Sequence, residues 1–281
     1  MNQLKRLNTT TLIALLGITL IGLSCAKVVF TGRRQAKMIP SSQINDMSFQ
    51  QYDEFLKKNK PIKSGNEYQM VLEVGRKIQK AAELYYRANG IEDKIAGFKW
   101  EYNVVKDDKM VNAFCMPGGK VVVYTGILPI AKDRDGLAVI MGHEVAHALA
   151  NHGNERMSQQ LGVSGAIGLA DAVLSGGGSS SEKRRNRDIF LGAVGAGAQL
   201  GILLPFSRKH ESEADEIGLY LMAIAGYDVD QAAPFWERMQ SGGGQTPPEF
   251  MSTHPSPETR SQNLREWAPK AKELAKQYSL N

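Results

Sequence analysis

The chain has 281 residues, of which 42% are hydrophobic and 22% are charged. This composition is ordinary for a globular protein and excludes a disordered or fibrous chain. The 34 Lys and Arg residues outnumber the 29 Asp and Glu residues, and the formal net charge is +5. This charge is small and dispersed, so we expect no nucleic-acid partner. The two cysteines, Cys25 and Cys115, are too few for a disulfide scaffold.

A basic and then apolar segment opens the chain. Lys5 and Arg6 precede an uncharged apolar run over residues 12–23, which is short for a membrane span and ends just before Cys25. The pattern resembles a bacterial lipoprotein signal peptide. It predicts that residues 1–24 are removed and that Cys25 carries the lipid. The alternative is an uncleaved anchor with an ordinary cysteine, and both interpretations leave this segment outside the fold.

The next part of the chain predicts helices followed by a small sheet. Residues 25–43 lack periodicity, and we expect a tether there. Helices are predicted over 44–58 and, from a capping box to an Asn-Gly stop, over 64–90. Apolar and polar residues then alternate over 98–104, which indicates a strand. Two apolar runs flank Pro-Gly-Gly within 111–125, which indicates a hairpin or a sharp kink. The expected sheet has three or four strands.

From Asp135 onward the pattern is helical. One helix is predicted to run through about Gln160. A glycine-rich stretch over 162–205 is expected to be a lid or a membrane-proximal insertion. Within it begins a marginal candidate for a membrane span, over 189–206. Further helices are predicted over 209–225, over 230–239 and from Ser256-Pro257 onward.

The strongest chemical signal is His143-Glu144-Val145-Ala146-His147. Two histidines at positions i and i+4 of a helix project from one face, so both can bind one zinc ion. Glu144 follows the first histidine, which places its carboxylate beside the metal rather than on it. A carboxylate there can take a proton from the water that attacks the substrate. A chance match on an amphipathic helix is the alternative, and the otherwise apolar helix argues against it.

A catalytic zinc site needs a third protein ligand. His152 has the wrong spacing for a metzincin-type ligand, and we expect it at the helix end or behind a ligand instead. Glu155 lies about two helical turns along the helix, out of reach. The better candidates are Glu211 and Asp215, which share a helix face. One of these two can bind zinc while the other accepts a hydrogen bond from a metal-bound histidine. Alone, such an acidic cluster would more often be a solvated surface, but the incomplete zinc site favours the metal interpretation.

Several motifs together resemble the HtpX/BepA-like zinc metallopeptidases, a family of gluzincin endopeptidases. In the order typical of the family, the His-Glu-x-x-His motif is followed by a glycine-rich insertion, then by Glu211-Ser212-Glu213-Ala214-Asp215, and then by Thr253-His254-Pro255. Further matches are Asn112-Ala113-Phe114 with Pro117-Gly118-Gly119-Lys120, Leu204-Pro205-Phe206-Ser207-Arg208, and Thr31-Gly32-Arg33-Arg34-Gln35, the last of these typical of lipoprotein members. The resemblance implies a mainly helical α+β fold over 44–281. In it, a zincin-like core packs a small three- to four-stranded sheet on the zinc-binding helix, with no tetratricopeptide repeats.

The resemblance also assigns residue roles. His143, His147 and Glu211 match the zinc ligands, Glu144 matches the general base, and Asp215 matches the acidic residue expected to orient His143. The strand over 113–116 matches the sheet edge on which zincins align substrate.

His254 matches the histidine of the family's Thr-His-Pro segment. It could donate to the oxyanion of the reaction intermediate, or it could bind zinc and hold the enzyme latent. It could also merely cap the following helix. Arg260 could pair with a carboxylate near the site.

Three functions are compatible with these residues. The first is a zinc endopeptidase in the periplasm, tethered to a membrane by a lipidated N-terminus, that hydrolyses misfolded or misassembled envelope proteins. The expected membrane is the outer membrane of a Gram-negative bacterium. The second is an assembly factor or chaperone that uses the same cleft with little proteolysis. The third is an integral-membrane protease of the prenyl-protein type, supported only by 189–206. The intact base at Glu144 favours the first.

Overall fold

The computed structural model describes residues 25–162, 206–241, 249–254 and 259–278. The predicted signal peptide, the glycine-rich stretch from residue 163 onward and the expected start of the last helix at Ser256-Pro257 lie outside these residues. Within the described ranges, no helix has both the length and the apolar character needed to cross a membrane.

A four-stranded sheet forms the base of the fold, with the strand order β3-β4-β6-β5. Its strands are β3 (Pro61–Ile62), β4 (Glu101–Val105), β5 (Ala113–Met116) and β6 (Lys120–Tyr124). β4 and β6 are parallel, whereas the other two pairs are antiparallel. The predicted hairpin joins β5 and β6, and its turn uses Gly118 and Gly119 at φ 81° and 85°. This topology leaves β5 at a sheet edge.

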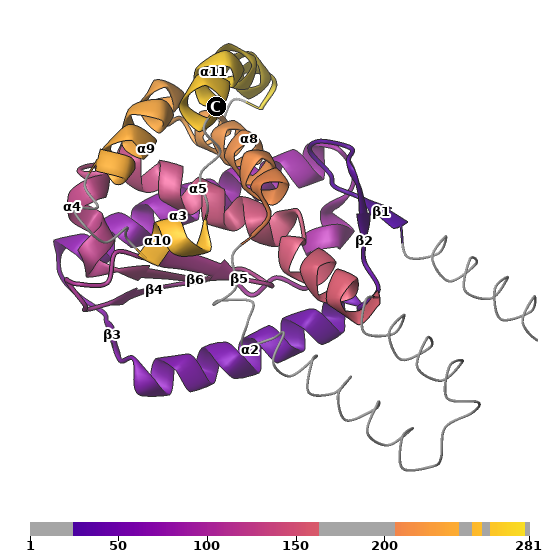
Figure 1. Ribbon diagram of the computed structural model, residues 1–281, viewed down its shortest axis with the longest axis horizontal. Helices are drawn as coiled ribbons and strands as arrows, with labels where there is room; N and C mark the ends of the chain where they lie inside the picture. The colour runs from indigo at the N-terminus through magenta and orange to yellow at the C-terminus, as the bar shows by residue number, and fades with distance from the viewer. Residues whose placement is uncertain (1–24, 163–205, 242–248, 255–258, 279–281) are drawn as a thin grey trace, which may run out of the picture.

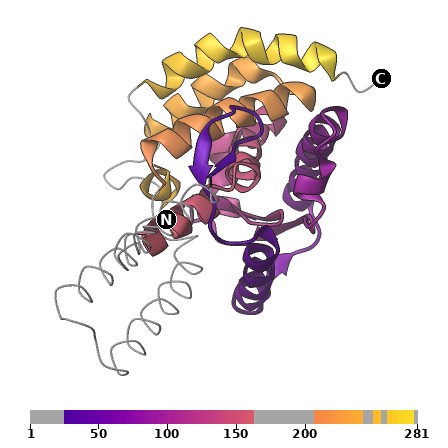
Figure 2. The same ribbon diagram turned by 90° about the vertical axis from the view of Figure 1, so that its right-hand side faces the viewer.

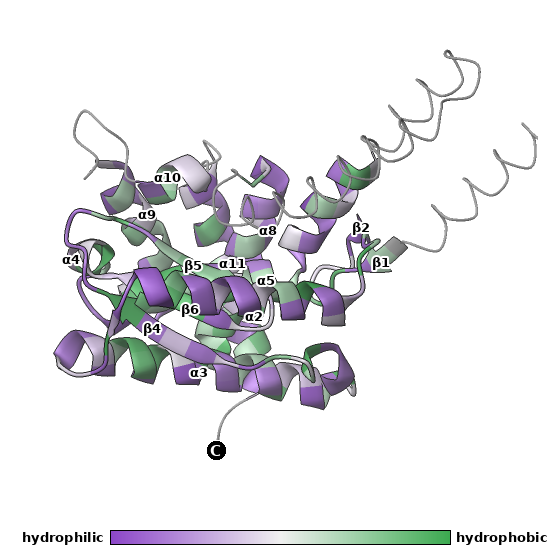
Figure 3. Ribbon diagram, turned by 90° about the horizontal axis from the view of Figure 1, so that it is seen from below, coloured by the Kyte–Doolittle hydropathy of each residue, from purple (hydrophilic) through white to green (hydrophobic). Residues whose placement is uncertain are grey.

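Helices cover both faces of this sheet (Figure 1). On one face lie α3 (Asn66–Ala88) and α5 (Arg134–Leu149), and on the other lies α2 (Ser41–Lys58). Seen from below, α2 crosses in front of the sheet and turns many hydrophilic residues toward the viewer (Figure 3). The predicted α+β fold, mainly helical with a small sheet packed on the helix that carries His143 and His147, is therefore confirmed.

An outer layer of helices packs on α5. It contains α8 (Arg208–Ile224), α9 (Ala232–Ser241) and α11 (Arg260–Gln277), which stack together in Figure 2. The short segments are η1 (Glu92–Ile95), η2 (Thr125–Ile127), α4 (Leu128–Ala131), η3 (Val229–Gln231) and α10 (Glu249–Thr253). Because α5 lies between the sheet and this layer, every residue from Gly136 to Leu149 is buried. Polar groups on α5 are thus held in the interior.

The helix predicted to run from Asp135 through about Gln160 is wrong in its length. α5 ends at Leu149, and residues 152–162 form a separate helix. Asn151 between them has a φ of 56°, in the left-handed region that Asn adopts more readily than most residues. The break redirects the chain, so that His152 returns toward the end of α5.

Two glycines set the distance between α5 and α8. A Cβ on Gly218 would lie 2.8 Å from the backbone nitrogen of His143, and a Cβ on Gly142 would lie 2.9 Å from the carbonyl oxygen of Gly218. No side chain fits between backbones this close. The Gly–Gly contact thus brings the acidic residues of α8 up to the histidines of α5.

We expect Gly218→Ala to destabilise the fold by about 1–3 kcal/mol, because the methyl group must push two helix backbones apart. The shift should also weaken metal binding, since it moves Glu211 away from His143. Urea unfolding and zinc titration measure the two effects. Gly162→Ala is the control, because a Cβ there meets nothing within 4 Å. Equal stability of the two variants would contradict the close-contact argument.

The N-terminal segment is not the tether predicted over 25–43. β1 (Cys25–Lys27) and β2 (Arg34–Ala36) form an antiparallel hairpin, and Val28 at its turn is buried in the main core. Arg33 anchors the hairpin through ion pairs of 2.7 Å to Glu155 and 2.6 Å to Glu213. The segment lacked periodicity because strands of three residues are too short to show one. α2 then begins at Ser41, before the predicted residue 44.

The Arg33–Glu155 pair should make the free energy of unfolding depend on pH. Burial raises the pKa of Glu155, but hydrogen bonds with His210 and Arg33 outweigh it and lower the pKa to about 2. A carboxyl pKa below its unfolded value stabilises the fold at neutral pH, and this stabilisation is lost as the pH falls from about 4.5 toward 2. Urea unfolding at pH 7 and at pH 3 measures the effect. The free energy of unfolding should fall less between these two pH values for Glu155→Gln than for the unsubstituted chain. The exposed Glu92→Gln should leave the curve unchanged, and parallel curves for all three proteins would disprove the assignment.

Candidate metal centre

Three elements supply the predicted site residues. α5 carries His143, Glu144 and His147, and the first turns of α8 carry Glu211 and Asp215. The side chain of Ser207 caps α8 by accepting a hydrogen bond from the His210 amide, which fixes where this helix begins. His254 directly follows α10. All six predicted site residues of these elements are buried: His143, Glu144, His147, Glu211, Asp215 and His254.

Four of these side chains converge on one point. His143, His147, Glu211 and His254 each offer a ligand atom, and these atoms lie within 4.8 Å of one another. The Nε2 atoms of His143 and His147 are 3.3 Å and 3.4 Å from the Glu211 carboxylate oxygens. Nδ1 of His254 is 3.2 Å from Glu211 Oε1 and 3.3 Å from His143 Nε2.

The chemistry of this donor set fits a divalent metal ion. Two imidazoles and one carboxylate make up the ligand set of many catalytic zinc sites. Burial raises the pKa of Glu211, but the adjacent histidines lower it well below its ordinary value. Arg260 pairs with Oε2 of this buried carboxylate, whereas Oε1 faces the imidazoles of His147 and His254. The donor set therefore fits a metal ion by its chemistry, and it contains the three ligands predicted from the sequence.

Glu144 lies beside this donor set. Its Oε2 accepts a hydrogen bond of 3.2 Å from the backbone amide of Cys115 in the edge strand β5. Its Oε1 is buried and has no hydrogen-bond partner among the described residues, and Nε2 of His254 lies 3.4 Å away. Burial raises the pKa of Glu144. One oxygen is thus fixed to the sheet, while the other is free to accept a proton.

Asp215 contacts His143, the histidine that it was expected to orient. Oδ1 of Asp215 is 2.9 Å from Nδ1 of His143, which leaves Nε2 for the metal. Arg260 donates to Asp215 over 2.6 Å and to Glu211 over 2.8 Å, and its guanidinium stacks 3.8 Å above the Trp236 ring. Arg260 is 1% exposed. The pairing suggested for it is thus present, with two carboxylates rather than one.

His254 lies among the metal-binding atoms rather than at the edge of the site. Its ring stacks on Phe250 at 4.5 Å between centroids, and its backbone amide bonds to the Phe250 carbonyl. α10 therefore holds the side chain in place. A centre with four protein ligands is closed, whereas a catalytic zinc site keeps one position open.

His152 and Phe206 contact the site without joining the donor set. Nδ1 of His152 is 2.9 Å from Nδ1 of His147, and the Phe206 ring stacks on His147 at 4.0 Å. Glu155 contacts Arg33 and His210 instead of the metal-binding atoms. The exclusion of His152 and Glu155 as ligands agrees with this geometry. The contact of His152 with His147 agrees with the expectation that His152 lies at a helix end or behind a ligand, and the break at Asn151 creates this contact.

Comparison with known proteins now decides the family. The model of peptidase family M48 matches residues 72–268, which is more than half of the chain. The chain belongs to peptidase family M48. The matched region includes α5, α8 and α10, and hence all the possible metal ligands. The predicted family is confirmed.

Curated relatives fall into two groups. A mitochondrial metalloendopeptidase OMA1 of Schizosaccharomyces pombe is 42% identical over 179 residues, covering 63% of this chain and 49% of that protein. A Saccharomyces cerevisiae protein of the same name is 34% identical and covers 70% and 56%. A β-barrel assembly-enhancing protease of Escherichia coli is 28% identical and covers 64% and 37%. The chain thus spans about half, or less, of the length of these relatives.

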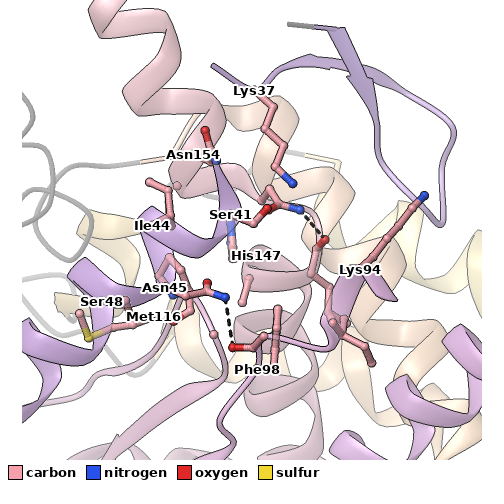
Figure 4. Close-up of a pocket in the computed structure, with 18 of the residues that line it drawn as sticks. Lys37, Ser41, Ile44, Asn45, Ser48, Lys94, Phe98, Met116, His147 and Asn154 are labelled. Carbon is pink, nitrogen blue, oxygen red and sulfur yellow. Dashed lines mark hydrogen bonds between the residues drawn. The ribbon is translucent and has the colours of Figure 1, made fainter. Parts of the chain in front are cut away.

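In this M48 chain a cavity of ≈ 700 Å³ adjoins the metal centre. Figure 4 shows Lys37, Ile44, Phe98, Met116 and His147 around it. Its walls come from the N-terminal hairpin, α2, the segment around η1, the edge strand and the end of α5. His147 is one of the lining residues, so the cavity reaches the donor set at this histidine.

Proposed function

We propose that this chain is a zinc-dependent endopeptidase. The observation that carries the proposal is the convergence of His143, His147 and Glu211 with Glu144 beside them. This arrangement gives three metal ligands and one carboxylate with a free oxygen, which is what metal-assisted hydrolysis requires. Membership of family M48 supports the same activity.

Each side chain of the site has a separate role in peptide hydrolysis. When bound, zinc would polarise the scissile carbonyl and lower the pKa of water. Glu144 takes a proton from the attacking water on Oε1 and passes it to the leaving amine. Asp215 and Arg260 hold His143 and Glu211 in place through the bonds described above. The hydrogen bond from Cys115 keeps Glu144 aimed at the site.

Unfolded segments of protein are the proposed substrates. β5 is an edge strand beside α5, so an extended segment can align along it. The adjoining cavity can take the side chains of that segment.

We place the enzyme in the cell envelope, tethered through a lipid on Cys25, and assign it misfolded or misassembled envelope proteins as substrates. The lipoprotein-like pattern before Cys25 supports the tether. The name of the Escherichia coli relative refers to β-barrel assembly, which supports an envelope role. The names of the yeast relatives refer instead to mitochondria. The proposal of an endopeptidase does not depend on this location.

An assembly factor that seldom cuts is the second candidate. His254 lies among the metal-binding atoms and would complete a four-ligand centre. We propose that this arrangement is a latent state and that His254 must leave for hydrolysis to proceed. If His254 never leaves, the cleft can still bind extended segments.

Metal content and degradation of casein, an unfolded protein, test the proposed function on residues 25–281. We expect one zinc ion per chain, cleavage of casein, loss of cleavage on treatment with a chelator, and recovery on adding zinc. Zinc without cleavage, both in the unsubstituted chain and in His254→Ala, would favour the assembly factor. Absence of stoichiometric metal would overturn the metal centre.

A further inference from the structure

Each metal-binding histidine of α5 is backed by its own chain of hydrogen bonds. Behind His143 lie Asp215 and then Arg260, which begins α11. Behind His147 lies a second chain, made of side chains to which the proposed mechanism assigns no role. Its members are His152, Glu213, Arg33 and Thr31, and we call it the hairpin relay.

The relay is continuous from the metal site to the N-terminal hairpin. Nδ1 of His152 is 2.9 Å from Nδ1 of His147, and Nε2 of His152 is 3.0 Å from Oε2 of Glu213. Arg33 donates to the same Glu213 oxygen over 2.6 Å. The hydroxyl of Thr31 donates to the other oxygen of Glu213. His152 and Glu213 are 0% and 6% exposed, so water does not compete for these bonds.

The proton positions in this relay are mutually consistent. His147 presents Nε2 to the metal-binding atoms, so its Nδ1 carries the hydrogen and donates to Nδ1 of His152. His152 must then carry its own hydrogen on Nε2, where Glu213 accepts it. A neutral imidazole has one donor and one acceptor, which matches the two contacts that His152 makes. Every link therefore has one donor and one acceptor.

We infer that the N-terminal hairpin is a working part of the metal centre: Arg33, through Glu213 and His152, positions His147 for metal binding. The inference rests on the proposed zinc site. Arg33, Glu213 and His152 are positioning residues, because none of them reaches the metal-binding atoms. The hairpin that begins at Cys25 thus positions His147, as the C-terminal helix α11 positions His143 through Arg260 and Asp215.

The carboxylates bonded to Arg33 provide a matched pair for a test. Glu213 bonds to both Arg33 and His152, whereas Glu155 bonds to Arg33 and His210. Glu213→Leu therefore breaks the relay, while Glu155→Leu removes a similar buried ion pair without touching His152. Each variant removes one of the two carboxylates that pair with Arg33, and Glu155→Leu leaves the bonds of Arg33 and Thr31 to Glu213 in place. Only Glu213→Leu should alter the surroundings of His147.

The measurement is zinc affinity of the full chain by competition with a chelator, together with the visible absorption spectrum of the cobalt-substituted protein. We expect Glu213→Leu to weaken zinc binding by about 10- to 100-fold, as loss of partners behind metal-binding histidines does elsewhere. Its cobalt spectrum should shift, because the His147 ring is no longer held. Glu155→Leu should keep the affinity and the spectrum of the unsubstituted chain.

Arg33→Ala and Arg34→Ala form a second pair in case the buried leucine variants do not fold. Arg34 is exposed on the same hairpin, so its loss should have no effect on zinc. Arg33→Ala should weaken zinc binding, and the effect should vanish in a His152→Ala background, because the relay is already broken there. Equal zinc affinity and spectra in Arg33→Ala and Arg34→Ala would overturn the inference. Absence of zinc from the unsubstituted chain would instead overturn the proposed function.

Discussion

Glu144→Gln should abolish peptide hydrolysis while leaving zinc binding intact. Glutamine keeps the shape of the side chain and can still accept the hydrogen bond from the Cys115 amide. It cannot take a proton from water, so the chain loses its general base. Loss of such a base typically costs about 10²- to 10⁴-fold in rate. Cleavage of casein and zinc content, measured on the same preparation, give both results.

Glu73→Gln is the matched control for this substitution. Glu73 is a surface carboxylate that pairs with Arg134 and does not belong to the donor set. Its replacement should change neither zinc content nor cleavage. Undiminished cleavage by Glu144→Gln would remove Glu144 from the role of base. Loss of zinc from that variant would show that Glu144 supports the centre structurally.

The residues of α5 could be predicted from the sequence because their geometry is local. Positions i and i+4 of a helix face the same way in any fold, so His143 and His147 define a site by themselves. Glu211 and Asp215 needed the family resemblance to separate their roles, since either carboxylate could have been the ligand. The contact between Gly142 and Gly218 then explains why α8 comes close enough for that ligand to reach.

The relay behind His147 could not be predicted in this way. Arg33 and Glu213 lie 180 residues apart in the chain, and no periodic pattern links them. His152 comes near His147 only because Asn151 takes a left-handed conformation that ends α5. The helix pattern itself continued past this point, so it predicted one helix instead of two. Arg33 was noticed only as part of a resemblance to lipoprotein members, without a structural role.

His254→Ala should increase the rate of peptide hydrolysis. The imidazole lies among the metal-binding atoms, and Nε2 lies 3.4 Å from Glu144 Oε1, where the attacking water must bind. Removing the ring opens one position on the metal ion and the space beside Glu144 Oε1 for the attacking water. If the open state is a minor population in the unsubstituted chain, the gain should be about tenfold or more. Zinc should bind less tightly, because one of four ligands is lost. Cleavage of a short unstructured peptide and zinc titration measure the two effects.

His210→Ala separates this expectation from a general loosening of the site. His210 is a buried histidine of α8 that bonds to Glu155 and stays outside the donor set, so its loss should bring no gain in rate. A fall of about 10²- to 10³-fold in His254→Ala would instead assign His254 to the oxyanion, since that is the usual cost of losing one such donor. An unchanged rate would leave it only a helix-capping role. The direction of the change thus distinguishes a latent enzyme, which must release His254 to act, from one that needs His254 in every turnover.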